Sequence, residues 1–135
     1  MDLQLRNKVV IVTGASEGIG RAAAERFSQE GALVALAART QNDLDNVAND
    51  IASTSGNAVI GIATEVRKEE SVKALIEAVV KKWGKIDVLV NNAGTSSASR
   101  LEELTNEQVD EDFNLKVKGA IFCTRHALPY LKKSR

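Results

Sequence analysis

The sequence predicts an α/β protein with a doubly wound parallel sheet. Short continuous apolar runs, typical of strands covered on both faces, alternate with segments in which apolar residues recur at helical spacing. The first run, Val9-Val10-Ile11-Val12, leads directly into a glycine-rich turn, Thr13-Gly14-Ala15-Ser16-Glu17-Gly18-Ile19-Gly20, and then into the first helical segment. Strands that alternate with helices are joined by right-handed crossovers, so we expect one parallel sheet with helices on both faces.

Four strands are expected, and each coincides with one apolar run: Lys8 to Thr13, Leu33 to Ala37, Ala58 to Ala63 and Ile86 to Val90. The helices between them are predicted from three apolar stripes: Ile19, Ala23 and Phe27; Leu44, Val47 and Ile51; and Val72, Leu75, Ile76, Val79, Val80 and Trp83. Gly31, Gly56 and Gly84 follow these helices, where a left-handed residue commonly ends a helix.

A fourth helix is predicted from Thr105, which can cap it together with Gln108 three residues later. We expect its apolar stripe to face the core, with Cys123 close to it as a small apolar residue. The stripe consists of Val109, Phe113, Val117, Ala120, Thr124 and Leu128.

Composition excludes several classes of function. The chain of 135 residues has 18 Lys plus Arg and 18 Asp plus Glu, so no overall charge favours nucleic acid or an anionic membrane. It contains neither an apolar run of membrane-spanning length nor a secretory leader. A single cysteine excludes an internal disulfide, and we expect a reducing, cytoplasmic location. No cluster of His, Cys, Asp or Glu has the spacing of a metal site.

The glycine-rich turn predicts a phosphate-binding site. Gly14 can adopt backbone angles closed to other residues, and Gly18 and Gly20 have no Cβ to obstruct a ligand or a neighbouring strand. The free amides at the start of the first helix, together with the helix dipole, favour a bound anion. In a doubly wound fold such a ligand lies outside the carboxyl ends of the strands.

Three motifs resemble the short-chain dehydrogenase/reductase family: Thr13-Gly14-x-x-x-Gly18-x-Gly20, Ile86-Asp87-Val88-Leu89-Val90-Asn91-Asn92-Ala93-Gly94 and Thr124-Arg125-His126-Ala127-Leu128-Pro129. The resemblance covers essentially the whole chain, but only the amino-terminal portion of a family member. It implies a single NADP-binding, Rossmann-like domain over residues 1–135, incomplete at the carboxyl end: the sheet is truncated after the fourth strand and following helix. In the family order of strands, 3-2-1-4, the fourth strand would have a bare apolar edge, and we expect residues 1–135 alone to aggregate or oligomerise.

The resemblance also implies a function. Members are NAD(P)-dependent oxidoreductases that interconvert alcohols and carbonyl compounds by hydride transfer, and they assemble partly through the helix that begins here at Thr105. We therefore expect a small-molecule carbonyl or alcohol substrate and a homo-oligomer. The segment from Thr95 to Leu101 would line at most one wall of the substrate site, and the substrate itself is not identified.

The resemblance assigns most of the cofactor site. Glu65 and Val66 would contact the adenine, where the family usually has Asp in place of Glu65. Asn91 is expected to brace the turn by bonding backbone. The pyrophosphate and ribose would be surrounded by Gly14, Ser16, Glu17, Gly18, Ile19 and Gly20, and the nicotinamide-side ribose would lie beside Asn92, Ala93 and Gly94.

The end of the second strand indicates NADP rather than NAD. An acidic residue is expected about twenty positions beyond the glycine turn if the ribose hydroxyl of NAD is bound. The matching position holds Ala38, followed by Arg39 and Thr40, which complete the candidate cofactor-binding residues. Arg39 can form two parallel bonds with a 2′-phosphate. Glu17 opposes this interpretation, but its side chain can swing outward.

No catalytic residue is assigned. Family chemistry needs a serine, a tyrosine and a lysine four residues after that tyrosine, whereas Tyr130 is followed at that spacing by Ser134. Lys116 stands where many members have a catalytic asparagine, three residues before Gly119. Its ammonium group could serve a proton relay or contact the cofactor ribose; alternatively, its stem covers apolar surface while its head reaches water.

Two other functions remain open. If the chain ends at Arg135, it could be a non-catalytic nucleotide-binding or docking module. A methyltransferase also begins with strand, glycine turn and helix, but that class needs an acidic residue at the end of the second strand. Ala38, Arg39 and the motif from Asn91 to Gly94 argue against it.

Overall fold

A computed structural model describes residues 1–94 and 100–134. Its centre is a four-stranded sheet in the order β3-β2-β1-β4, the order that the resemblance to the family implied. All neighbouring strands are parallel. The strands are β1 (Val9–Thr13), β2 (Leu33–Ala38), β3 (Val59–Ala63) and β4 (Val88–Val90).

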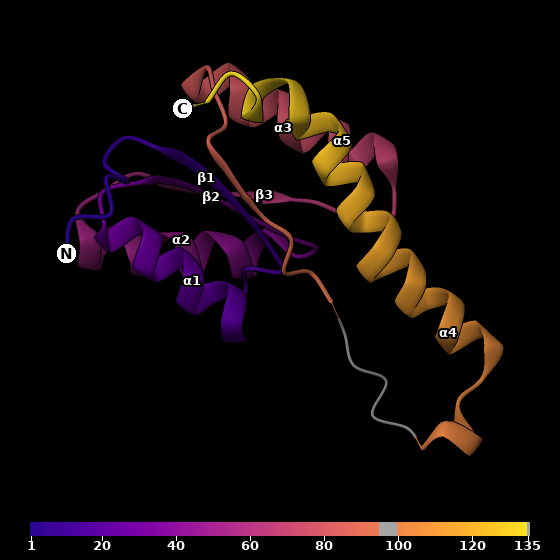
Figure 1. Cartoon of the computed structure of the whole chain (residues 1–135). Helices are drawn as coiled ribbons and strands as arrows, with labels where there is room; N and C mark the ends of the chain where they lie inside the picture. Colours follow the sequence, from indigo (N-terminus) through magenta and orange to yellow (C-terminus); the bar gives the residue numbers. More distant parts are fainter. Residues whose placement is uncertain (95–99, 135) are drawn as a thin grey trace.

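Helices cover both faces of the sheet (Figure 1). α1 (Gly18–Gln29) and α2 (Gln41–Ser55) lie on one face, and α3 (Glu69–Trp83) and α5 (Gly119–Leu131) lie on the other. Alternate side chains of each strand point to opposite faces, so β1 supplies both halves of the core. Val10 and Val12 pack with the α1 and α2 side, whereas Val9 and Ile11 pack with the α3 and α5 side. The continuous apolar run of β1 is thereby fully buried.

The predicted helix ends are confirmed. Gly56 and Gly84 follow α2 and α3 in the left-handed conformation, with φ of 74° and 78°. Their amides bond to the last turn of each helix and so satisfy carbonyls that would otherwise lack partners. Gly31 also has a positive φ, of 89°, two residues beyond α1.

The segment predicted as one fourth helix is interrupted. After a short 3₁₀ turn (Leu101–Glu103), α4 (Asn106–Phe113) begins at the predicted cap. The Gln108 amide donates to the Thr105 hydroxyl at 3.2 Å, and the Thr105 amide donates to the Gln108 side chain at 2.9 Å. A π-helical turn (Asn114–Lys118) then joins α4 to α5.

The prediction that the stripe of this segment faces the core is wrong. Phe113 is 61% exposed, and Val109, Val117 and Leu128 are also exposed. A π-helical turn holds more residues than an α-helical one, so it rotates the residues after it relative to those before it. The core-facing positions of α5 are instead Gly119, Cys123 and Ala127, whose small side chains let the helix approach its neighbours closely.

Asp87 fastens the amino-terminal ends of β1 and β4. Its carboxylate accepts hydrogen bonds from the Val9 amide at 2.8 Å and from the Ser134 hydroxyl at 2.6 Å, and Lys85 lies 3.2 Å away. The Asp87 amide also donates to the carbonyl of Val9, so the chain follows β1 before β4 formally begins. The strand predicted from Ile86 therefore begins at Val88 in the structure, although the chain lies beside β1 from Asp87. β4 lies at the edge of the sheet, with half-buried side chains.

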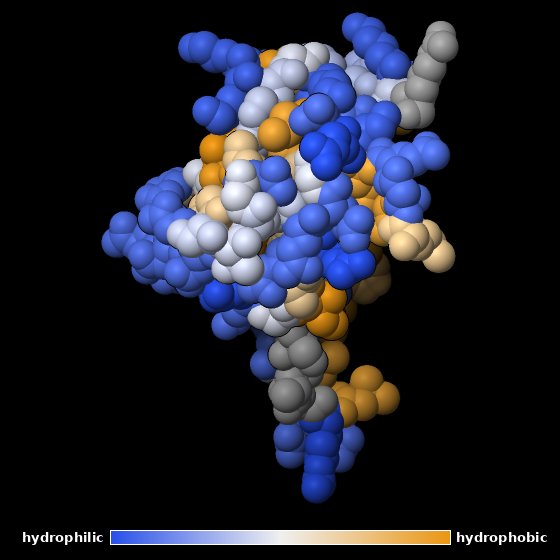
Figure 2. Space-filling model, turned by 90° about the vertical axis from the view of Figure 1, so that its left-hand side faces the viewer, coloured by the Kyte–Doolittle hydropathy of each residue, from blue (hydrophilic) through white to orange (hydrophobic). Residues whose placement is uncertain are grey.

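The surface is mixed in character. Figure 2 shows a largely hydrophilic face with smaller apolar patches, and apolar side chains also lie on the part of the chain that projects below the main body. Within the ranges 1–94 and 100–134, no helix combines the length and apolar character that crossing a bilayer requires.

Candidate functional site

An open cleft of about 800 Å³ lies at the carboxyl ends of the strands. This is the edge where a doubly wound sheet binds its ligands. The structure brings together there all the predicted cofactor-binding residues except Gly20, and adds Lys116. The predicted residues that line the cleft are Gly14, Ser16, Glu17, Gly18, Ile19, Arg39, Thr40, Glu65, Val66, Asn92, Ala93 and Gly94.

The glycine turn forms the floor of the cleft where β1 passes into α1. Gly14 and Gly18 have φ of 63° and 60°, which side-chain-bearing residues rarely adopt. Gly20 does not line the cleft but allows the turn to pack closely, because a Cβ there would collide with the Gly14 carbonyl and the Asn92 side chain. Glu17 precedes α1 in an extended conformation and makes no capping hydrogen bond with its side chain. The amides of the first turn of α1 are therefore available to an anionic ligand.

Thr13 joins the glycine turn to the loop after β4, a role that sequence reasoning missed. Its hydroxyl accepts hydrogen bonds from the amides of Asn92 and Ala93 at 3.0 and 2.9 Å, and donates to the Val90 carbonyl at 3.3 Å. The Asn92 side chain donates to the Gly14 carbonyl at 3.1 Å. The two loops that define the cleft are thus held as one unit.

Asn92, not Asn91, braces the turn. The expectation for Asn91 is wrong, because its side-chain amide donates to the Thr124 hydroxyl of α5 at 3.1 Å. Successive residues of an extended segment point to opposite faces, so only one of the two asparagines can face Gly14.

The end of β2 places a positive charge in the cleft. Arg39 and Thr40 follow Ala38, and both side chains are exposed and line the cleft. Within residues 1–94 and 100–134, no carboxylate lies within ion-pair distance of Arg39. The next residue, Gln41, donates to the Gly61 carbonyl and accepts from the Ala63 amide, at 2.8 and 2.9 Å. This side chain, which the sequence did not single out, fixes the start of α2 against β3.

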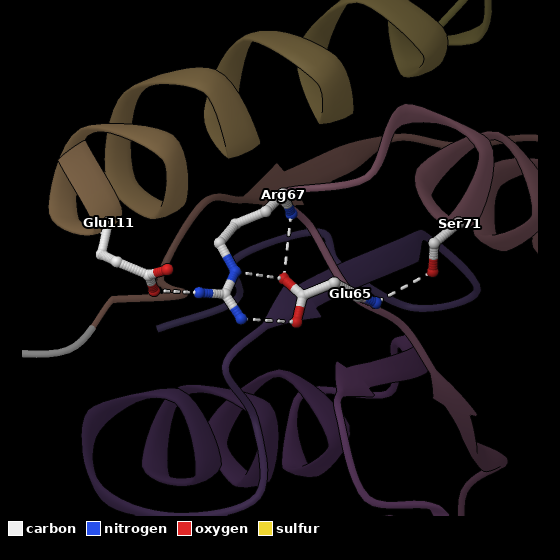
Figure 3. A network of polar contacts seen from close by, with 4 residues as sticks. All are labelled: Glu65, Arg67, Ser71 and Glu111. Atoms are coloured by element: carbon white, nitrogen blue, oxygen red, sulfur yellow. Dashed lines mark hydrogen bonds and ion pairs between the residues drawn. The ribbon is translucent and has the colours of Figure 1, made fainter. Parts of the chain in front are cut away.

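Glu65 is held by a neighbouring arginine (Figure 3). Arg67 donates from Nε and Nη2 to the two carboxylate oxygens at 2.9 and 3.1 Å, and its third nitrogen contacts Glu111 of α4. These hydrogen bonds are the main reason why the pKa of Glu65 lies below its ordinary value. Arg67 and Glu111 were not predicted. The spacing of Arg67 from Glu65 was visible in the sequence, whereas the approach of α4 was not.

Lys116, in the π-helical turn between α4 and α5, lies at the end of the cleft formed by the loop after β4. A Cβ placed on Gly94 would lie 3.4 Å from Cε of Lys116, so the lysine stem runs beside the Gly94 backbone. Lys116 is exposed and lines the cleft together with Leu115. The structure therefore places a lysine within the candidate site, at the end occupied by Asn92, Ala93 and Gly94.

The remaining reactive side chains lie elsewhere. Tyr130 belongs to α5 and packs, partly buried, against the core on that face of the sheet. His126 pairs with Glu69 through Nε2 at 3.0 Å. Burial raises the pKa of the Cys123 thiol to about 11, so the thiol stays protonated near neutral pH. The described part of the chain contains no group of three or more potential metal ligands. Residues 95–99 of the expected substrate wall lie outside the described residues.

Comparisons with known proteins agree with this geometry. The family described as short chain dehydrogenase matches residues 8–135. Meso-2,3-butanediol dehydrogenase of Serratia marcescens is 37% identical over 98% of this chain and 52% of its own length. The 3-oxoacyl-[acyl-carrier-protein] reductase FabG of Thermotoga maritima is 35% identical over 98% of this chain and 54% of its own length.

Solved structures give the same result. L-sorbose reductase of Gluconobacter frateurii, complexed with NADPH and L-sorbose, superposes with a TM-score of 0.93 at 36% identity, over 98% of this chain and 51% of that one. An alcohol dehydrogenase of Thermococcus sibiricus, complexed with 5-hydroxy-NADP, superposes at 0.91 with 34% identity, over 96% and 55%. The chain thus spans about half the length of these relatives. Its sequence motifs, its Rossmann-like sheet and these matches together establish that the chain belongs to the short chain dehydrogenase family.

Proposed function

We propose that the whole protein is an NADP(H)-dependent oxidoreductase that interconverts alcohols and carbonyl compounds, and that residues 1–135 form its cofactor-binding domain. One observation carries the proposal: the uncapped start of α1 opens into a cleft that also holds the guanidinium of Arg39, which has no ion-pair partner among the described residues. Support comes from relatives named as dehydrogenases and reductases, and from neighbours complexed with NADPH and 5-hydroxy-NADP.

The glycine turn would hold the pyrophosphate. The amides of Gly18 and Ile19 begin α1, and the exposed position of Gly18 leaves space for a phosphate to approach the backbone. Ser16 adds a hydroxyl at the same place. Backbone amides at a helix start bind anions because their hydrogen bonds and the helix dipole act together.

Arg39 would select NADP over NAD. Ala38 presents no carboxylate to repel a 2′-phosphate, and Arg39 can approach this group bidentately. Thr40 adds a hydroxyl beside it. Glu17 is exposed, so its side chain can remain in water when a phosphate binds nearby. Glu65 and Val66 would flank the adenine.

The nicotinamide would lie toward Asn92, Ala93 and Gly94. When bound, it supplies or accepts the hydride of the reaction. Lys116, which runs beside Gly94, would place an ammonium group near the ribose or the reacting oxygen. Residues 1–135 contain no tyrosine followed four positions later by lysine, and we name no catalytic residue among them.

The exposed apolar face of α4 and α5 would bind a second copy of the protein. It consists of Val109, Phe113, Val117, Ile121 and Leu128, and these side chains follow one another along the segment that was predicted to face the core. A group of exposed apolar side chains on one helical segment is typical of an association site. We propose that it contributes to a homo-oligomer.

The experiment that tests the proposal follows NADPH in two ways. In a fluorescence titration, the full-length protein should bind NADPH more tightly than NADH. NADPH should then be consumed in the presence of some member of a panel of small ketones, aldehydes and keto sugars. Binding without turnover across the panel would favour the alternative, a nucleotide-binding or docking module, and no binding of either dinucleotide would refute both.

A further inference from the structure

The carboxylate of Glu65 is almost fully engaged by Arg67. Besides the two side-chain hydrogen bonds of Figure 3, the backbone amide of Arg67 donates to the same carboxylate at 3.1 Å. The amide of Glu65 is held in turn by the hydroxyl of Ser71 at 2.9 Å. The side chains of Arg67 and Glu65 are 29% and 20% exposed, so water screens this pair less than a fully exposed one.

Glu65 and Arg39 are neighbours at the ends of adjacent strands. Ala38 of β2 pairs with Ala63 of β3, and the Thr64 amide donates to the Ala38 carbonyl at 2.7 Å. Arg39 and Glu65 therefore leave the sheet side by side and line the same cleft. The positive charge of Arg39 contributes, after Arg67, to keeping the pKa of Glu65 low.

A free carboxylate at this position would oppose NADP in two ways. It would attract the guanidinium of Arg39 away from a bound 2′-phosphate, and it would repel the phosphate itself. Arg67 prevents both effects because its guanidinium group donates hydrogen bonds to both carboxylate oxygens of Glu65 at once.

We propose that Arg67 is a positioning residue that sets the preference for NADP: by sequestering Glu65, it leaves Arg39 free for the 2′-phosphate. The inference rests on the proposed function and adds a residue to it. Glu111, a residue of α4, accepts a hydrogen bond from the third nitrogen of Arg67 and so orients the guanidinium group. Because Glu111 is 66% exposed, its own charge is largely screened by water.

The test measures the dissociation constants of NADPH and NADH in the full-length protein. In Arg67→Gln, the ratio of the NADH constant to the NADPH constant should fall about tenfold, the scale of one charge-assisted hydrogen bond. The double variant Glu65→Gln/Arg67→Gln should recover the wild-type ratio to within about threefold. Arg21→Gln, which removes an arginine paired with Glu25 and Asp50 outside the cleft, is the control and should leave the ratio unchanged.

A purely structural role of Arg67 predicts a different pattern. NADPH and NADH would then lose affinity equally in Arg67→Gln, so the ratio of their dissociation constants would stay constant. The double variant would not recover the lost affinity. This pattern overturns the inference. If Arg67→Gln does not fold, Glu65→Gln alone decides: its ratio should equal or exceed that of the wild type, and a lower ratio refutes the inference. If the wild type prefers NADPH and Arg67→Gln keeps the same ratio, only this inference is refuted. If the wild type binds neither dinucleotide, the proposed function is refuted as well.

Discussion

The hydroxyl of Thr13 accepts a hydrogen bond from the amide of Ala93, 80 positions later in the chain, at 2.9 Å. The same oxygen also accepts from the Asn92 amide, so one side chain at the end of β1 satisfies two backbone donors of the loop after β4. Thr13 is only 1% exposed, and water cannot easily replace it. The contact unites the two halves of the candidate cofactor site.

Thr13→Val should therefore destabilise the protein. The substitution keeps the shape but removes the acceptor of the Ala93 amide and one of the two acceptors of the Asn92 amide, which also bonds to the Val90 carbonyl at 3.1 Å. The expected cost in the free energy of unfolding is about 1–3 kcal/mol. Urea denaturation measures this loss. Thr54→Val is the control, because the Thr54 hydroxyl bonds to the Asp50 carbonyl on an exposed helix surface. Equal stability of the two variants would show that Thr13 does not secure the loop.

Lys116→Met should impair turnover more than folding. If the ammonium group serves proton transfer or ribose positioning, kcat should fall by about a hundredfold, the lower range for acid–base groups. Lys118→Met removes an exposed lysine of the same π-helical turn that does not line the cleft, and it should retain activity. Steady-state kinetics of the full-length protein compare the two. Matching kinetics would assign Lys116 a surface role only.

Phe113→Glu should weaken self-association. Phe113 belongs to the exposed apolar face and is 61% exposed, so a carboxylate there costs little in the isolated chain but is unfavourable in an apolar interface. Sedimentation of the full-length protein should shift toward monomers. Leu101→Glu changes an equally apolar exposed residue on the 3₁₀ turn and should leave the assembly intact. An unchanged oligomer in Phe113→Glu would exclude this face.

Asp87 should make stability depend on acid pH. Burial alone would raise the pKa of this carboxyl, but hydrogen bonds from Ser134 and the Val9 amide, together with Lys85, outweigh burial and hold the pKa below its ordinary value. A carboxyl with a lowered folded pKa stabilises the protein above its unfolded pKa of about 3.9, and this stabilisation is lost as pH falls through the folded value.

Asp87→Asn should consequently be less stable at neutral pH and should show a flatter decline in acid. Unfolding free energies measured between about pH 6 and pH 2 compare it with the wild type. Asp110→Asn removes the same charge from an exposed position and serves as the control. A parallel decline in Asp87→Asn and wild type would refute the assignment to Asp87.

The sheet and the cleft were predictable because local patterns determine them. The continuous apolar run before Thr13 identifies a strand buried on both faces, and the spacing of Gly14, Gly18 and Gly20 fits a turn that must approach other backbone closely. The position of the site follows from the general rule for doubly wound sheets. The strand order was implied by the resemblance to the family.

The missed features depend on contacts between distant segments. Helical periodicity assumes a constant number of residues per turn, so it could not reveal the π-helical turn before Gly119. The buried positions of α5 lie one residue before the predicted ones. The choice between Asn91 and Asn92 depended on which side of the chain faces Gly14. The ion pair of Arg67 with Glu111 joins residues 44 positions apart and has no local signature.

The proposed function depends on Arg39 and the start of α1 binding NADP together. Its most direct test is a fluorescence titration of NADPH and NADH with Arg39→Asp, using Arg26→Asp on the exposed surface of α1 as the control. Arg39→Asp should weaken NADPH binding by at least about tenfold while NADH binding is retained, and Arg26→Asp should resemble the wild type. Unchanged NADPH affinity in Arg39→Asp would contradict this expectation.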